Sequence, residues 1–79
     1  DRVIFFRVYP NPTSGLLFLE STHGGPYQVE VLDVSGKRIM PVFTSNQPDA
    51  TLEMPDLSGL YFVRITHGQV TETTKVYVY

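Results

Sequence analysis

The sequence contains no cysteine, and this absence excludes both a disulfide framework and a thiolate metal site. It also lacks any apolar run approaching the roughly 20 residues that a membrane-spanning helix needs. No N-terminal signal peptide is visible, and the chain begins with "DRVIFF" without an initiator Met. We therefore expect the chain to be part of a longer precursor whose export signal lies upstream.

Concentrated positive charge is also missing. Six Lys and Arg stand against eight Asp and Glu, which gives a net charge of −2, and the basic residues are scattered along the chain. A nucleic-acid-binding protein normally gathers positive charge on one face to neutralise phosphates. We therefore expect no nucleic-acid partner.

Residue patterns for catalysis are absent as well. His23 and His67 lie beside glycines in predicted turns, outside any metal-ligand spacing. Asp33 and Asp56 share one turn context, which explains them better than an acid–base pair does. Three serines precede glycine in turns, without the strand–turn–helix setting of a hydrolase nucleophile, and these are Ser14, Ser35 and Ser58. We expect a protein that is not an enzyme and that binds no metal and no cofactor.

What the chain does contain is strand and turn signals. Its 79 residues are enough for one domain, and 42% of them are apolar. Short β-branched and aromatic runs alternate with clusters of Gly, Pro, Asn, Asp and Ser. The pattern predicts strands over Val3–Tyr9, Leu16–Glu20, Tyr27–Val34, Lys37–Phe43, Thr51–Met54, Leu60–Thr66 and Val70–Tyr79. The fold class expected is all-β, an immunoglobulin-like seven-stranded antiparallel β-sandwich.

Alternation along the strands predicts which side chains are buried, because successive residues of a strand point to opposite faces. The predicted core consists of Ile4, Phe6, Val8, Leu17, Leu19, Tyr27, Val29, Val31, Leu52, Met54, Tyr61, Val63 and Ile65.

The predicted turns use recognisable chemistry. "DVSG" (Asp33–Gly36) and "DLSG" (Asp56–Gly59) both have the Asp and Gly preferences of a type I turn. "HGQ" (His67–Gln69) is typical of a tight hairpin. In "VYPNPTSG" (Val8–Gly15), the prolines fix φ and lack amide protons, so this stretch should end one strand and direct the chain toward the next.

Two apolar surfaces leave alternatives open. Leu16 and Phe18 fall on the face opposite Leu17 and Leu19, and the chain ends in "KVYVY". Tyr77 and Tyr79 either cover the sandwich in part or belong to a surface on which a partner docks or extends the sheet edge. An unprotected terminal strand also makes a homodimer by strand pairing or swapping possible.

The order of motifs carries a family likeness. "VYPNPTSG", "VEVLDVSGKRI", "LSGLYFVRIT" and "TTKVYVY" follow one another from about Arg7 to Tyr79. In this order they resemble the C-terminal sorting domain of the type IX (Por) secretion system of Bacteroidetes-type bacteria.

The resemblance implies a function in protein export. The precursor would cross the inner membrane by a conventional signal peptide, and the domain would direct it from the periplasm through the outer-membrane translocon. At the cell surface a sortase would remove the domain and attach the cargo to an anionic lipopolysaccharide, or the domain would be kept. Family members commonly finish with a basic residue, whereas Tyr79 closes this chain, which leaves room for an uncleaved variant.

Transferred residue by residue, the family motifs fall on Pro10, Asn11, Pro12, Gly15, Asp33, Gly36, Gly59, Tyr61 and Lys75. Tyr77 and Tyr79 complete the set of candidate recognition residues. Two other functions stay open: an immunoglobulin-like adhesion or carbohydrate-binding module, and a structural domain that caps its neighbour.

Overall fold

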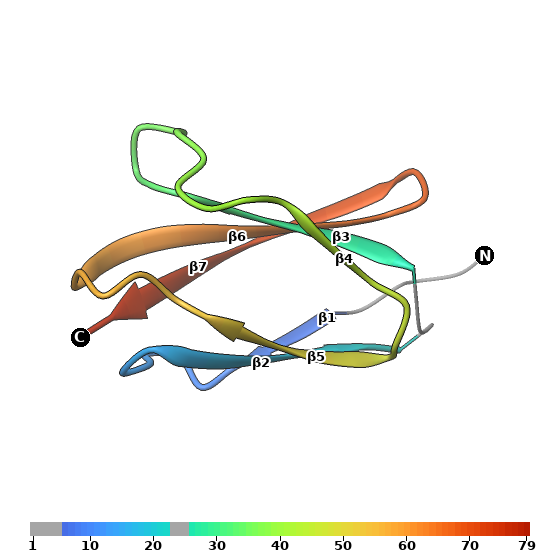
Figure 1. Cartoon of the computed structure of the whole chain (residues 1–79), viewed down its shortest axis with the longest axis horizontal. Helices are drawn as coiled ribbons and strands as arrows, with labels where there is room; N and C mark the ends of the chain where they lie inside the picture. The colour runs from blue at the N-terminus through green and yellow to red at the C-terminus, as the bar shows by residue number, and fades with distance from the viewer. Residues whose placement is uncertain (1–5, 23–25) are drawn as a thin grey trace.

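Two antiparallel sheets form the described part of the chain, residues 6–22 and 26–79, in the computed structural model (Figure 1). The strands are β1 (Phe6–Tyr9), β2 (Leu16–Ser21), β3 (Tyr27–Leu32), β4 (Phe43–Ser45), β5 (Asp49–Glu53), β6 (Gly59–His67) and β7 (Val70–Val78). One sheet has the order β1-β2-β5 and the other β4-β3-β6-β7. The described residues form no helix, and hence none that could span a membrane.

The predicted fold class is confirmed. Hairpins join β1 to β2, β3 to β4 and β6 to β7, whereas β2 pairs with β5 and β3 with β6 across longer stretches of sequence. The two sheets face each other as the layers of an immunoglobulin-like sandwich (Figure 1).

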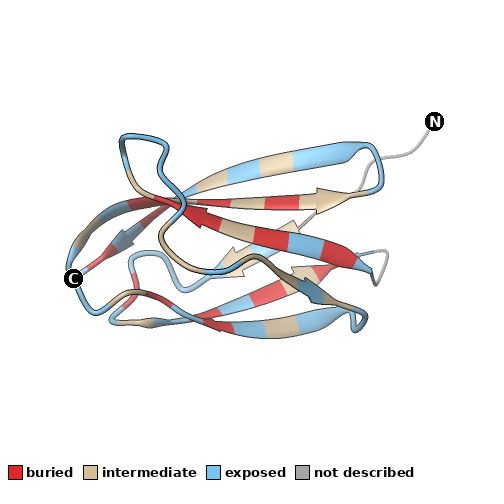
Figure 2. Cartoon of the chain, turned by 45° about the horizontal axis from the view of Figure 1, so that its top comes forward, coloured by how far each residue is buried: buried red, intermediate tan, exposed pale blue. Residues whose placement is uncertain are grey.

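Buried residues lie on the facing sides of the two sheets, where Figure 2 shows them alternating with exposed ones. The prediction for this core is confirmed at Leu17, Leu19, Tyr27, Val29, Val31, Leu52, Met54, Tyr61, Val63 and Ile65. Phe6 and Val8 pack against this cluster but are only partly buried, and Ile4 lies outside the described residues. The core also includes Leu32, Val76 and Val78, which the sequence analysis did not assign to it.

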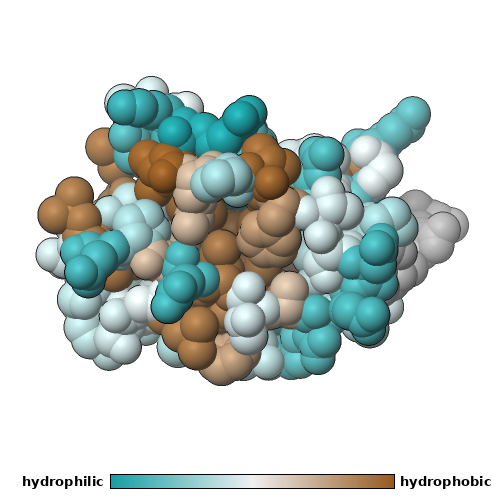
Figure 3. All heavy atoms as spheres, in the orientation of Figure 1, coloured by the Kyte–Doolittle hydropathy of each residue, from teal (hydrophilic) through white to brown (hydrophobic). Residues whose placement is uncertain are grey.

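The strand predicted over Lys37–Phe43 is wrong. Only Arg38 of this stretch forms an isolated bridge, opposite Leu32, and β4 begins at Phe43. Pro41 has no amide proton to donate to a ladder, so regular pairing starts after it. Ile39 and Met40 instead pack partly buried against the core. On this side of the sandwich, apolar side chains gather between the two sheets (Figure 3).

Other strand boundaries also differ from the prediction. The second strand ends at Ser21, the sixth spans Gly59–His67 and the seventh ends at Val78, each a shift of one residue. The third strand ends at Leu32 rather than Val34, because Asp33 begins a hydrogen-bonded turn. The fifth begins at Asp49 and ends at Glu53, so that its first residues pair with Leu19 and Glu20. The first is described only from Phe6 onward.

The Asp33 turn and the His67 hairpin follow the prediction, and the Asp56 turn does not. His67 pairs with Val70 across a two-residue connection whose Gly68 has φ +62°, which is the predicted tight hairpin. His67 itself is the last residue of β6 and partly buried rather than a turn residue, and His23 lies outside the described part of the chain. The "DLSG" stretch forms an open bend, and within the described ranges Asp56 accepts no hydrogen bond from a local amide, so the expected second type I turn is wrong.

Candidate recognition site at the end of β7

The turn between β1 and β2, residues 10–15, crosses to the other sheet and pairs with the end of β7. Thr13 forms a parallel bridge with Val78. The Thr13 amide donates to the carbonyl of Tyr77 at 2.9 Å, and the Tyr79 amide donates to the carbonyl of Thr13 at 3.0 Å. This turn therefore joins the two sheets and covers part of the outer edge of β7.

Asn11 attaches the same turn to β7 through its side chain. Its Nδ2 donates to the carbonyl of Lys75 at 2.7 Å, and its Oδ1 accepts from the amide of Tyr77 at 3.1 Å. Pro10 and Pro12 flank it, both after cis peptide bonds. The structure thus brings the predicted residues Pro10, Asn11 and Pro12 to Lys75 and Tyr77, more than 60 positions later in the chain.

Thr13 is a site residue that the sequence analysis missed. It is 1% exposed, and its Oγ1 donates to the carbonyl of Leu16 at 2.6 Å and accepts from the amide of Gly15 at 3.1 Å. The carbonyl of Gly15 accepts from the amide of Met54 at 2.7 Å, which ties the turn to the end of β5. A threonine hydroxyl that satisfies a local amide two residues later is a known turn device, and this was the available sequence signal.

The last strand alternates in burial at this end. Val76 and Val78 are buried in the core, whereas Tyr77 is 49% exposed and Tyr79 is 68% exposed. Leu60 of β6, which pairs with Tyr77, is also exposed. The two tyrosines therefore present much of their rings to the surface beside the Asn11–Thr13 contacts.

Gly59 and Tyr61 hold the start of β6 against the end of β7. Gly59 pairs with Val78, and Tyr61 pairs with Val76. The Tyr61 hydroxyl donates to the carbonyl of Leu57 at 2.6 Å, the hydrogen bond of a tyrosine corner in immunoglobulin-like domains. Gly59 has φ +151°, a conformation that costs little only for glycine.

Asp33 and Gly36 lie in a separate turn at the end of β3. One carboxylate oxygen of Asp33 accepts from the amides of Ser35 (2.9 Å) and Lys37 (3.0 Å) and from the Ser35 hydroxyl (2.6 Å). Gly36 has φ +88° and donates its amide to the carbonyl of Asp33. The hydrogen bonds of this pair stay within their own turn, so the structure does not bring them to the β7 site.

Two carboxyl groups on this sheet titrate below their usual range. The Ser35 hydroxyl hydrogen bond, aided by the Lys37 amide, lowers the pKa of Asp33. The hydrogen bond from Arg64 (2.9 Å) lowers the pKa of Glu30, and the charges of Arg64 and Arg38 add to this effect. In both cases the folded chain favours the ionised carboxylate.

We expect acid to destabilise the domain through these two groups. Because each folded-state pKa is lowered, their stabilising effect is complete above the usual carboxyl pKa of about 4 and is lost as the pH falls below it. Melting temperatures measured between pH 7 and pH 3 should stay level at first and then decrease. The Glu30→Gln and Asp33→Asn variants should melt lower than the parent at pH 7 and show a shallower acid decrease. An unchanged acid slope in both variants would contradict the assignment.

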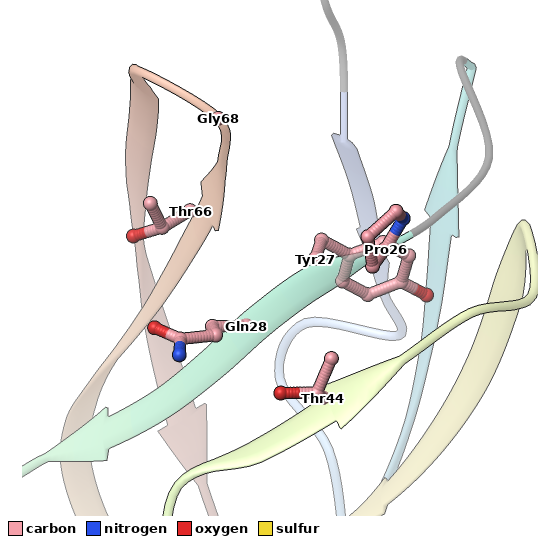
Figure 4. A pocket seen from close by; sticks show the side chains of 6 residues that line it. All are labelled: Pro26, Tyr27, Gln28, Thr44, Thr66 and Gly68. Carbon is pink, nitrogen blue, oxygen red and sulfur yellow. The ribbon is translucent and has the colours of Figure 1, made fainter.

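An open hollow lies on the outer face of the four-stranded sheet (Figure 4). Thr66, Gln28 and Thr44 form a row across β6, β3 and β4 here, since each pairs with the next. Pro26, Tyr27 and Gly68 complete its lining. The side chains that reach the surface offer hydroxyl and amide groups, and the hollow is at the hairpin end of the sheet, away from Tyr77.

The outer face of the three-stranded sheet carries a second exposed group of apolar residues. Phe18 and Leu16 are 39% and 47% exposed, which confirms that β2 is apolar on both faces. Tyr9 packs on Phe18 with 5.7 Å between ring centroids, and the Arg7 guanidinium lies 5.1 Å from the Tyr9 ring centroid. Arg7 also pairs with Glu20 at 2.9 Å, so charged groups border this patch.

Comparison with known protein families identifies the family of this chain. Residues 7–79 match the model of the secretion system C-terminal sorting domain, and no curated protein matches the chain. The matched region includes the turn at residues 10–15, the Asp33 turn, the tyrosine corner and β7. Such domains mark a protein for export through the outer membrane to the cell surface or the extracellular space, and they are generally non-catalytic. The chain therefore belongs to the family of C-terminal sorting domains of the type IX secretion system.

Proposed function

We propose that this domain directs its cargo from the periplasm through the type IX outer-membrane translocon and then to the surface sortase. The observation that carries the proposal is the end of β7. Main-chain and side-chain hydrogen bonds from Asn11 and Thr13 hold this segment in place, while Tyr77 and Tyr79 remain exposed on it.

Within this proposal the candidate residues have different roles. Tyr77, Tyr79 and Lys75 form the surface that the machinery contacts. The turn residues Pro10, Asn11, Pro12 and Gly15 position that surface, and Gly59 and Tyr61 support it from β6. Asp33 and Gly36 act at a distance by closing β3, which stabilises the sheet to which β7 belongs.

Further steps follow the family pattern. The sortase would remove the domain and attach the cargo to anionic lipopolysaccharide, or the domain would stay on the cargo at the outer membrane. A homodimer formed by strand pairing or swapping is the competing use of the β7 edge, because β7 is an outer strand of its sheet.

The geometry favours the sorting role over a carbohydrate-binding module. Sugar sites usually combine an aromatic platform with polar groups for the hydroxyls. Here Tyr77 and the hollow beside Thr66 are at opposite ends of one face, since Thr66 pairs with Thr71, six residues before Tyr77. Six residues of strand span about 20 Å, too far for one small sugar to contact both.

A reporter fusion tests the proposal. The 79 residues would follow a signal peptide and a fluorescent protein in a host with a working type IX system, beside a translocon mutant. We expect fluorescence at the surface or in the medium of the parent host and in the periplasm of the mutant. Periplasmic retention in both hosts would contradict the sorting function, and the fragment size would distinguish cleavage from retention of the domain.

Replacement of the two exposed tyrosines tests the recognition surface. We expect Tyr77→Thr/Tyr79→Thr to keep the melting temperature within a few degrees, because both rings are largely exposed and threonine favours strands. Export of the fusion should nevertheless fall. Tyr9→Thr, which removes a tyrosine exposed on the other sheet, is the matched control and should be exported normally. Undiminished export of the double variant would exclude these rings as the recognised surface.

A further inference from the structure

Along β7, the N–H and C=O groups of successive residues point alternately toward β6 and toward the outer edge of the sheet. Tyr77 directs both its N–H and its C=O outward, to Asn11 and Thr13, and Lys75 directs its C=O outward, to Asn11. Because the period of a strand is two residues, the N–H and C=O of Thr73 and Thr71 also point outward. The two-residue hairpin is consistent with this assignment. Its closing pair, His67 and Val70, then exchanges main-chain hydrogen bonds between β6 and β7, and every second residue of β7 after Val70 does the same.

Among the described residues, only the second half of this edge has a partner. The turn at residues 10–15 occupies the outward groups from the carbonyl of Lys75 to the amide of Tyr79. Within residues 6–22 and 26–79, nothing pairs with the outward groups of Thr71 and Thr73 or with the amide of Lys75. Exposed residues also predominate in this half of β7, whereas the second half has buried valines (Figure 2).

The open half carries two charged residues, Glu72 and Lys75, but it is neither short nor interrupted. Proteins protect edge strands by shortening them, by interrupting them with proline or a bulge, by placing charged side chains on them, or by covering them. Here β7 is nine residues long and keeps an unbroken register with β6 over nine pairs, without proline. The other outer strand of this sheet, β4, has only three residues. The first half of β7 is therefore a regular ladder edge ready to accept another strand.

We propose that an extended segment of the outer-membrane export machinery adds to β7 as a strand along Thr71–Lys75. This inference rests on the proposed sorting function and specifies how the export machinery recognises the domain. Five residues of edge are about 16 Å long. That length suits a short peptide better than a second copy of the chain, because stable interfaces bury roughly 1,200 Å² or more. The turn at residues 10–15 sets the end of the added strand, since it occupies the edge beyond Lys75.

The test uses the fluorescent fusion with Thr73→Pro. The Thr73 amide points away from β6, so proline removes a donor that no residue of 6–22 and 26–79 uses but an added strand would. Proline is tolerated at such edge positions. Thr73→Val keeps the amide and the side-chain shape and is the matched control. We expect about a tenfold decrease in surface fluorescence for Thr73→Pro, equivalent to about 1.4 kcal/mol of docking energy, and normal export of Thr73→Val. Resistance of the domain to limited proteolysis would verify that each variant is folded.

Each outcome has one meaning. Export of folded Thr73→Pro at the parent level would overturn the inference while leaving the sorting function intact. Retention of the parent fusion itself would contradict the sorting function and this inference with it. If Thr73→Pro does not fold, Thr71→Pro makes the same test one outward position nearer the hairpin. A purified parent that is dimeric, with a monomeric Thr73→Pro variant, would show that a second copy occupies the edge and that the inference is wrong.

Discussion

The Tyr61→Ala variant is expected to be unfolded or only marginally folded at 25 °C. Tyr61 lies on β6 and is 6% exposed in the core between the two sheets, and its hydroxyl donates to the carbonyl of Leu57. Truncating a buried aromatic side chain to alanine costs roughly 3–5 kcal/mol. A domain of this length has a total stability of only about 4–12 kcal/mol. The loss would be measured as the change in free energy of unfolding in urea.

The Tyr61→Phe variant separates the two contributions of this side chain. It keeps the ring in the core and removes only the hydroxyl that donates to Leu57, so we expect a smaller loss of roughly 1–3 kcal/mol. Equal losses for the two variants would show that the hydrogen bond, rather than the packing of the ring, accounts for the effect. Export of a fusion carrying Tyr61→Ala should be lost with folding, whereas Tyr61→Phe should be exported whenever it is folded.

The second large effect is expected at Thr13. Thr13→Val preserves the shape of the side chain but leaves the Gly15 amide and the Leu16 carbonyl without the hydroxyl. Unsatisfied groups of this kind cost roughly 1–3 kcal/mol. Because the turn also holds the edge of β7, we expect faster hydrogen exchange at the amides of Tyr77 and Tyr79. Urea unfolding and amide exchange of the same sample measure the two effects together.

Thr13→Ser is the control for this experiment. Serine keeps the hydroxyl and loses one methyl group, so the exchange of the Tyr77 and Tyr79 amides should stay close to that of the parent. Slower exchange in Thr13→Val than in Thr13→Ser would contradict the assigned role of the hydroxyl. Asn11→Ala provides an independent comparison, since it removes the side-chain bonds to β7 but leaves the Thr13 bridge in place.

Much of the sandwich is readable from local sequence patterns. Alternation of apolar and polar residues gives the correct inward face for β2, β3 and β6, because the two-residue period of a strand is a local property. The pattern fails over Lys37–Phe43, where apolar residues such as Ile39 and Met40 cover the core from a segment that is not a strand. Burial without strand pairing leaves no distinctive period, so the sequence signal was misleading there.

The turns illustrate a related limit. "DVSG" and "DLSG" have the same residue preferences, yet only Asp33 accepts hydrogen bonds from its own turn. In the second motif the chain leads directly into β6, where Gly59 pairs with Val78 and the Tyr61 hydroxyl donates to the carbonyl of Leu57. The chain reaches these positions through an open bend rather than a type I turn. Tertiary packing outweighs local turn propensity at this position.

The sequence by itself determined the strand-and-turn class of this protein, most of its core and, through the order of its motifs, its family. Only the tertiary structure decided that Asn11 and Thr13 lie against Lys75, Tyr77 and Tyr79. It also decided that the turn at residues 10–15 covers the second half of the β7 edge, while no other described residue pairs with the first half. The physical reason is that these contacts use main-chain N–H and C=O groups, which every non-proline residue carries. The identity of the residues therefore does not predict these contacts. Only the folded path of the chain brings partners more than 60 positions apart into hydrogen-bonding distance.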